Sequence, residues 1–348
     1  MEHSAAKYFK GDKVIWIVVL LLSVVSLVAV YSSTGTLAYR YQAGNTAYYI
    51  LKHSTFLLIG LFVIFITHLI PYKYYSRLSQ LFLLISIPML MITLIMGISL
   101  NEAARWLTVP GLGITFQTSD FAKLALIMYV ARLLSVKQDR IREFKGAFLP
   151  IIIPVMMVCL LILPANLSTA AILFTVCLIL MFIGRIRFLY LASLVGIGIV
   201  AMSLFVIIAL SVEKEGRIGT WKSRIENFIT GDSEGNYQVE QAKIAIATGG
   251  LFGKGPGNST QRYFLPHPYS DFIYAIIVEE YGIIGGMVLL ILYLYLLFRA
   301  GVIVRRCVRT FPAFLAIGLS FMLVFQAMIN MAVSVNLLPV TGQTLPLV

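Results

Sequence analysis

Long apolar blocks of about twenty residues constrain the fold of this chain more than any other feature of its sequence. Each block has about the 17–25 residues that an α-helix needs to cross a bilayer. With 59% hydrophobic and only 12% charged residues, the chain holds more apolar surface than one soluble core can bury. The sequence therefore predicts an all-α polytopic membrane protein, with a single transmembrane domain over residues 1–348 and spans at 14–32, 54–71, 81–100, 118–135, 147–164, 167–184, 188–212, 271–298 and 311–334.

The charges of the short loops predict the orientation in the membrane. Under the positive-inside rule, the basic loops lie in the cytoplasm, together with the N-terminus. The long segment 213–270 is then expected outside, as one large extracytoplasmic loop. These loops account for most of the net charge of +12, so no nucleic-acid partner is expected. The basic residues concerned are Lys73, Arg77, Lys137, Arg140, Arg142, Lys145, Arg185, Arg187, Arg299, Arg305, Arg306 and Arg309.

The two ends of the chain carry separate signals. The first apolar block follows Lys7, Lys10 and Lys13 and lacks a small-residue cleavage pattern, which is typical of a retained helix rather than a signal peptide. Residues 337–348 read as a half-inserted element after which another apolar helix could begin. We therefore expect the chain to stop before or within its last helix.

A carboxylate at the start of one apolar block is the first candidate for a functional group. Asp271 opens the block, and Glu279 and Glu280 lie within it. Each acid costs about 2.5–3.5 kcal/mol at the bilayer centre, so each needs a reason to be there. On one straight helix, Asp271 and Glu279 would differ by a rise of about 12 Å and by about 80° around the axis. They are therefore not a catalytic pair, and we interpret the two glutamates as structural.

The long segment 213–270 contains further polar candidates. It includes a helix-compatible stretch near 237–248 and a glycine run at 249–257 that lacks the spacing of a nucleotide-binding loop. Glycines tolerate positive φ and expose their N–H groups, so the run predicts either plain turns or contact with an anionic ligand. Both alternatives stay open. The candidate cations and small residues of this segment are Arg217, Lys222, Arg224, Lys254, Gly255, Ser259 and Ser270.

A second polar cluster precedes the span at 118–135. It contains Arg105 and Trp106, a turn at 110–113, and then Gln117, Ser119, Asp120 and Lys123. Asp120 and Lys123 are three residues apart and can pair on one helix face. The pair either stabilises the helix end, or Lys123 faces a cavity and holds an anionic substrate.

These groups favour one class of chemistry. Ligand sets for metal hydrolysis, and a Ser or Cys with a His base, are missing from the sequence. Transfer of a sugar from a good leaving group to an alcohol needs only one general base, which Asp271 would supply. Arg and Lys side chains, or a divalent cation (Mg²⁺ or Mn²⁺), would neutralise a departing pyrophosphate. No organic cofactor is expected.

Several motifs together give the chain a resemblance to a known family. In their order and spacing they resemble the SEDS family of shape, elongation, division and sporulation proteins, and the ending 340–346 is more similar to its division branch than to its elongation branch. The motifs are Arg105-Trp106, Gln117-x-Ser119-Asp120-x-x-Lys123, Tyr237-Gln238, the glycine run with Ser259, Ser270-Asp271-Phe272-Ile273, Glu279-Glu280-x-Gly282 and Leu338-Pro339-Val340-Thr341-Gly342-x-Thr344-Leu345-Pro346.

The resemblance implies a fold, an activity and partners. It implies a bundle of ten transmembrane helices, of which about nine are in this chain, and a glycosyltransferase that polymerises lipid II on the outer face of the cytoplasmic membrane. It also implies a class B penicillin-binding protein as transpeptidase partner, other divisome membrane proteins, and a place at the division septum. The family's essential Asp falls on Asp271, its Arg-Trp pair on Arg105 and Trp106, and its intramembrane Lys on Lys123.

The chain also departs from the family pattern. Where the family usually has a His before its Thr-Asp pair, this chain has Tyr269. The family's Gln-Pro-Ser-Glu corresponds to Gln117-Thr118-Ser119-Asp120, and Asn166 replaces the acid of the family's Pro-Asp-Leu-Gly-Thr. A flippase and a scaffold are the alternatives to the polymerase. A flippase for lipid II should place charges through the membrane's depth, whereas a scaffold for the transpeptidase should tolerate replacement of Asp271.

Overall fold

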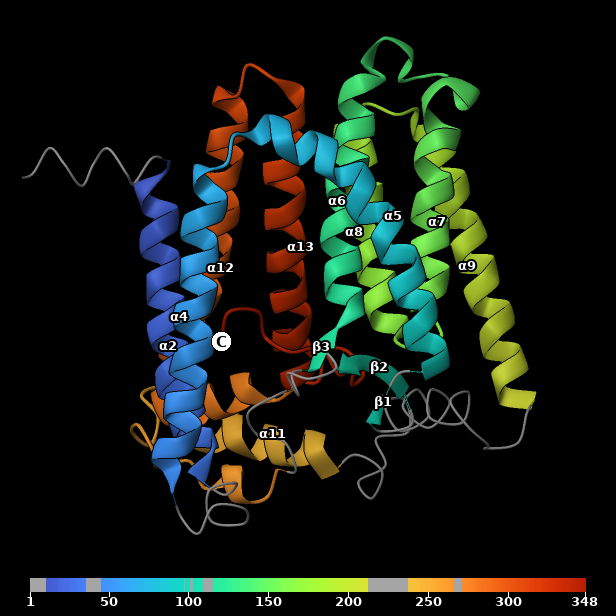
Figure 1. The fold of residues 1–348 in the computed structure, drawn as a ribbon. Helices are drawn as coiled ribbons and strands as arrows, with labels where there is room; N and C mark the ends of the chain where they lie inside the picture. Colours follow the sequence, from blue (N-terminus) through green and yellow to red (C-terminus); the bar gives the residue numbers. More distant parts are fainter. Residues whose placement is uncertain are drawn as a thin grey trace, which may run out of the picture. The chain divides into compact units, whose positions relative to one another are not determined.

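The computed structural model describes most of the chain (Figure 1). The described residues are 11–35, 45–96, 98–100, 103–108, 115–211, 237–265 and 271–348. For residues 98–100, 103–105, 108, 201–202 and 205–211 only the backbone is described. Arg217, Lys222, Arg224 and Ser270 lie outside the described residues.

Each predicted span contains a helix. Among the described residues, six helices are long and apolar enough to cross a bilayer: α2, α4, α5, the segment Phe144–Ile162, α12 and α13. The α-helices are α2 (Lys13–Ser33), α4 (Thr46–Leu69), α5 (Tyr72–Met96), α6 (Thr118–Val136), α7 (Leu149–Ile162), α8 (Leu167–Ile183), α9 (Phe188–Ser211), α11 (Tyr237–Gly249), α12 (Ile273–Arg306) and α13 (Thr310–Ser334). Short helical turns are η1 (Gln138–Arg140), η2 (Phe144–Phe148) and η3 (Gln261–Tyr263).

Several predicted bounds were wrong. Helices α4 and α5 begin at Thr46 and Tyr72, well before the predicted 54 and 81, and α12 runs on to Arg306 rather than 298. Hydropathy marks the apolar block, whereas a helix continues through polar residues at the membrane surface where its backbone is still hydrogen-bonded internally. The predicted helix around 237–248 is confirmed as α11.

A small sheet lies between α5 and α6, where helix and a turn were predicted. Its antiparallel strands β1 (Ile98–Leu100), β2 (Ala103–Thr108) and β3 (Thr115–Gln117) follow in that order. Residues 98–100 were therefore wrongly assigned to a span, because a short apolar run does not distinguish a strand from a helix. The predicted turn at 110–113 lies outside the described residues.

Contacts between Cα atoms divide the chain into two compact units. Unit 1 comprises residues 1–71, 226–299 and 323–348, and unit 2 comprises 72–225 and 300–322. The sequence predicted a single transmembrane domain over residues 1–348. The division into two units does not decide this point, and the single domain stays a prediction.

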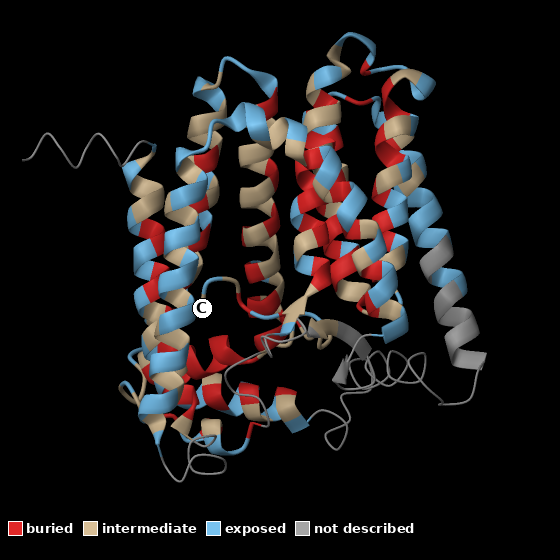
Figure 2. Cartoon of the chain, in the orientation of Figure 1, coloured by how far each residue is buried: buried red, intermediate tan, exposed pale blue. Residues whose placement is uncertain are grey.

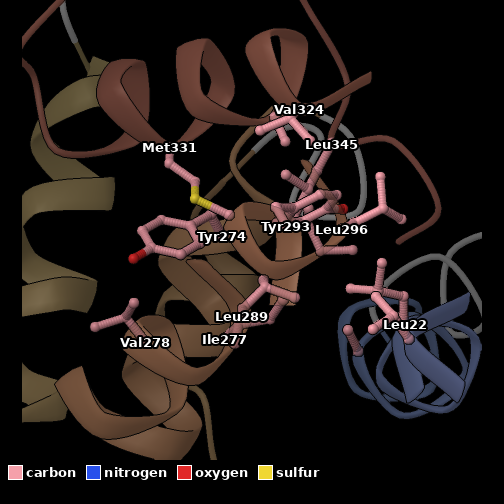
Figure 3. Packing of buried hydrophobic residues seen from close by; sticks show 14 residues of the cluster. Leu22, Tyr274, Ile277, Val278, Leu289, Tyr293, Leu296, Val324, Met331 and Leu345 are labelled. Carbon is pink, nitrogen blue, oxygen red and sulfur yellow. The ribbon is translucent and has the colours of Figure 1, made fainter. Parts of the chain in front are cut away.

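Unit 1 is built around the apolar face of α12. Side chains of α2, α12 and α13 and the late residue Leu345 form one buried cluster, in which Tyr274, Tyr293 and Met331 lie near one another (Figure 3). The hydroxyl of Tyr293 donates to the main-chain oxygen of Pro346, which ties the last residues to α12. In contrast, α4 has no buried residue (Figure 2), so its apolar side chains are left for lipid.

The start of α2 is fixed to the far part of α12. Asp12 caps α2 by accepting from the Val14 amide at 2.9 Å, and it pairs with Arg299 Nη2 at 2.7 Å. The Arg299 hydrogen bond is the main cause of a lowered pKa for the Asp12 carboxyl. Both groups therefore lie at one end of unit 1, and the predicted cytoplasmic side for that end stays a prediction.

Unit 2 packs α6 against α5, α7 and α8. Buried residues run along most of α6 (Figure 2), among them Leu126, Val130 and Leu134, none of which is exposed to solvent. Thr93 of α5 donates to Thr118 at the start of α6 at 2.9 Å. The first turn of α6, which carries several predicted site residues, is thus held by its neighbour.

Candidate functional site

Asp271 lies in a turn and not on a helix. Helix α12 begins two residues later at Ile273, so the straight helix assumed for Asp271 and Glu279 was wrong. The Asp271 side chain is half-buried, whereas Phe272 and Ile273 after it are buried. The main-chain oxygen of Asp271 accepts a hydrogen bond of 2.9 Å from Asn330 Nδ2 on α13. A partly open carboxylate on a backbone fixed by a buried amide is suited to proton transfer at the edge of the apolar region.

Glu279 is the centre of a buried polar cluster in unit 1. Its side chain has no exposed surface and accepts five hydrogen bonds. Lys254 Nζ donates to Oε1 at 2.6 Å, and the Thr260 and Gln261 amides donate at 3.1 and 3.2 Å. The Thr260 hydroxyl donates at 2.8 Å, and the Ser259 hydroxyl donates to Oε2. The carboxylate therefore organises the segment 254–261 around itself.

Glu280 extends the same cluster toward α2. It is 1% exposed, and it accepts from the Ser32 hydroxyl and from the Ser259 amide at 3.3 Å. Arg262, two residues beyond Thr260, donates to the Ser32 main-chain oxygen at 3.1 Å. Both glutamates thus accept hydrogen bonds from polar groups of unit 1, as a structural role requires; the role itself stays a prediction.

The glycine run follows the backbone of α12. Gly282 has φ +71°, and a Cβ there would collide with the Leu251 main chain and approach the Phe252 nitrogen to 2.6 Å. The amides of Lys254 and Gly255 each donate at 2.9 Å to main-chain oxygens of Glu279 and Glu280. The glycines therefore allow close contact between two backbones, which agrees with the alternative of plain turns.

This cluster bears on two predicted substrate-binding residues. Lys254 is paired with Glu279, and Ser259 is 1% exposed and bonded to both glutamates. Their predicted contact with substrate stays a prediction. Sequence reasoning missed Thr260, Gln261 and Arg262, because nothing in their spacing indicates which distant groups they contact.

The second predicted cluster lies in unit 2, at the junction of the sheet and α6. Trp106 of β2 is paired with Gln117 of β3, whose side chain donates to the Ser119 hydroxyl at 2.8 Å. Lys123 Nζ pairs with Asp120 Oδ1 at 2.7 Å, with 10% and 61% of the two side chains exposed. The predicted i, i+3 pair is confirmed, and its acid is the exposed partner.

Unit 2 holds two further features at this cluster, the strand residue Arg105 and a small cavity. Arg105 lies on β2 beside Trp106, but its side chain is outside the described part. A cavity of about 10 Å³ is lined by Gln117, Ser119 and Asn166, among others, and holds no more than about one water molecule. It is therefore too small for a sugar or a pyrophosphate.

Metal-ligand clusters are absent from the part of the chain that the structure describes. No three His, Cys, Asp or Glu side chains come together there as ligands for an ion. Mg²⁺ is usually held by one or two carboxylates together with substrate phosphates, an arrangement that needs no such cluster.

The predicted residues therefore form two groups. Asp271 and the cluster of Lys254, Ser259 and the two glutamates belong to unit 1, and the cluster from Trp106 to Lys123 belongs to unit 2. Within unit 1, the network around Glu279 fixes the glycine run on α12, whereas Asp271 lies at the start of that helix.

Comparison with known proteins places the chain among bacterial cell-cycle proteins. The family model described as cell cycle protein FtsW, RodA and SpoVE matches residues 12–348. The "Probable peptidoglycan glycosyltransferase FtsW" of Trichlorobacter lovleyi is 33% identical over 342 residues, covering 96% of this chain and 87% of that protein. Stage V sporulation protein E of Bacillus subtilis is 33% identical over 340 residues, covering 96% and 90%.

Solved structures show the same fold. A chain of a peptidoglycan synthase complex superposes with a TM-score of 0.76 at 22% identity, covering 98% of this chain and 92% of that one. RodA of Thermus thermophilus superposes with a TM-score of 0.69 at 22% identity, covering 98% and 90%. The predicted helical, multi-pass membrane fold is thereby confirmed.

Proposed function

Because the chain belongs to the FtsW, RodA and SpoVE family, the SEDS family of multi-pass membrane proteins, we propose that it is a peptidoglycan glycosyltransferase. It polymerises lipid II into glycan strands on the outer face of the cytoplasmic membrane. Relatives with 33% identity carry the name of that enzyme. Within the structure, the observation that carries the proposal is the half-buried carboxylate of Asp271 at the start of α12, on a backbone fixed by Asn330.

In the proposed reaction Asp271 acts as general base. The growing lipid-linked glycan is the donor, and a sugar hydroxyl of lipid II is the acceptor. The acceptor oxygen forms a bond to the anomeric carbon while the bond from that carbon to the pyrophosphate oxygen breaks. Asp271 takes the proton of the attacking hydroxyl, and the lipid pyrophosphate leaves with its electron pair.

The leaving pyrophosphate needs positive charge. Arg105 and Lys123 of unit 2 are proposed to supply it, with Trp106 as a platform for a sugar or lipid. Lys123 is suited to this because its side chain is only 10% exposed, and a buried cation interacts strongly with an anion. The predicted contributions of Arg217, Lys222 and Arg224 belong to the same proposal.

A divalent cation, Mg²⁺ or Mn²⁺, is part of the proposal only as an aid to the leaving group. One carboxylate of the chain and the substrate's own phosphates would hold it. The proton transfer to Asp271 does not involve the cation.

The location and partners follow from the same family. The chain is proposed to work at the division septum with its N-terminus in the cytoplasm, next to a class B penicillin-binding protein and other membrane proteins of the divisome. The Asp12–Arg299 pair supports the orientation, since it joins the N-terminal end of α2 to a predicted cytoplasmic arginine.

Replacement of the base tests the proposal. Purified Asp271→Asn should bind lipid II and form no glycan polymer, because an amide of the same size accepts no proton at neutral pH. Glu240→Gln, an exposed acid on α11, is the matched control and should polymerise as the unmodified chain does. Polymer of normal length and rate from Asp271→Asn would refute the assignment of the base. Translocation of lipid II in vesicles without polymer formation by the unmodified chain would refute the polymerase and favour a flippase.

A further inference from the structure

Asn330 is a buried amide on α13 that joins two distant parts of unit 1. It is 1% exposed. Its Nδ2 donates to the main-chain oxygen of Asp271 at 2.9 Å and to the main-chain oxygen of Gln343 at 2.7 Å. One side chain therefore connects the proposed base to the segment 341–345, whose residue Gln343 lies 72 positions after Asp271 in the chain.

The chemistry of the two partners determines which end of the amide faces them. Both partners are carbonyl oxygens, which only accept hydrogen bonds, so the NH₂ group must face them. Oδ1 is buried and has no hydrogen-bond partner within the described part of the chain. The position therefore requires two donors on one short side chain, and Asp, Ser or Leu cannot supply them.

The bond to Asp271 acts where the turn becomes a helix. The amide of Ala275 donates to the oxygen of Phe272 at 3.0 Å, so the first turn is tighter than a regular α-helix. Asn330 then holds the oxygen of Asp271 itself. Fixing this peptide plane fixes ψ of Asp271 and with it the direction in which the backbone presents the side chain.

We propose that Asn330 is a positioning residue for Asp271, and that it sets the geometry of the base through the backbone and not through contact with substrate. The inference rests on the proposed function for its effect on rate. It also couples the base to the segment 341–345, since the same NH₂ group holds both main-chain oxygens. Displacing that segment would therefore disturb the backbone of Asp271.

The chain offers a matched control one helical turn away. Gln326 on the same helix donates through Nε2 to the main-chain oxygen of Thr344 at 3.2 Å. Its amide holds the neighbouring carbonyl of the same segment, whereas Asn330 also holds Asp271. Gln326→Ala thus removes a tie to segment 341–345 and leaves the Asp271 bond in place.

Polymerisation kinetics test the positioning role. Asn330→Asp keeps the size and loses at least one donor, and Asn330→Ala loses both. We expect kcat to fall by about 100-fold in both variants, the loss typical of a reacting group displaced by about 1 Å, with KM within about threefold of the unmodified value. Gln326→Ala should keep kcat within about threefold. If both Asn330 variants keep kcat within threefold, or if Gln326→Ala loses as much, the inference is wrong.

Hydrogen exchange gives a second measurement that does not need activity. In Asn330→Ala, amides of residues 271–276 and 341–348 should both exchange at least about tenfold faster, whereas Gln326→Ala should affect only 341–348. Unchanged exchange at 271–276 in Asn330→Ala would overturn the inference even if polymerisation fell. If the unmodified chain makes no polymer, the proposed function fails, and the exchange result alone decides whether Asn330 holds Asp271.

Discussion

Removal of the Glu279 carboxylate should destabilise unit 1 more than loss of any exposed acid. Glu279→Ala deletes the acceptor of five hydrogen bonds. The amides of Thr260 and Gln261 then lose their acceptor, and Lys254 loses its buried partner. The glycine run, which these groups hold against α12, should open first.

The size of the destabilisation in Glu279→Ala follows from the hydrogen-bond donors that the variant leaves unpaired. A buried amide without an acceptor costs about 1–3 kcal/mol, so two of them cost about 2–6 kcal/mol. Lys254 is 28% exposed and can be rehydrated, so its loss of a partner adds little. We therefore expect Glu279→Ala to lose about 2–6 kcal/mol, set mainly by the two unpaired amides.

Removal of the lysine should also be costly. Lys254→Met leaves the Glu279 carboxylate, which has no exposed surface, with four donors but without a countercharge, and a loss of about 3–5 kcal/mol is expected. The double variant should be no more than about 0.5 kcal/mol worse than Glu279→Ala, because the two side chains act through one contact. Glu240→Ala, at an exposed position on α11, is the control and should cost less than about 1 kcal/mol.

Unfolding of the purified chain in mixed micelles, titrated with a denaturing detergent, measures these differences. A Glu279→Ala variant within about 1 kcal/mol of the unmodified chain would refute the reasoning, because it would mean that the buried donors find water or other acceptors. Strict additivity of Glu279→Ala and Lys254→Met would contradict the ion pair itself.

Three further predictions concern other parts of the chain. Gly282→Ala should destabilise the chain by at least about 1–2 kcal/mol, because a residue with a Cβ is strained at positive φ and because that Cβ would also collide with Leu251. Thermal unfolding measures the loss, and Gly301→Ala, where a Cβ meets open space on the same helix, is the control. The pKa of Asp12 is lowered mainly by Arg299, so this pair should stabilise the chain at pH values above the ordinary pKa of 3.8 and should stop doing so as the pH falls through the lowered pKa. In Asp12→Asn, unfolding midpoints measured between about pH 2 and 6 should lack this pH-dependent loss of stability, which is worth up to about 1 kcal/mol. A chelator should slow polymerisation of lipid II, with Mg²⁺ or Mn²⁺ restoring it; equal rates with and without chelator would exclude a role for the cation.

Local pattern was enough to predict the helices and some contacts. Apolar length predicted the spans, and the i, i+3 spacing predicted the Asp120–Lys123 pair, because both depend on neighbours along the chain. The short strands were missed because residues 98–100 pair with β2, and that pairing depends on backbone partners that hydropathy does not reveal. The network around Glu279 was missed for a similar reason, since its donors lie about twenty residues earlier in an irregular segment.

The sequence by itself determined the membrane class, the approximate spans and the acid just before α12, because the bilayer imposes a length and a polarity on each segment. Only the tertiary structure decided what each polar group faces. It placed Lys254 and Ser259 on Glu279, set Gly282 against Leu251, and put Asn330 between Asp271 and Gln343. The physical reason is that a buried hydrogen bond depends on distance and direction in space, and residues far apart in sequence acquire these only when the helices pack.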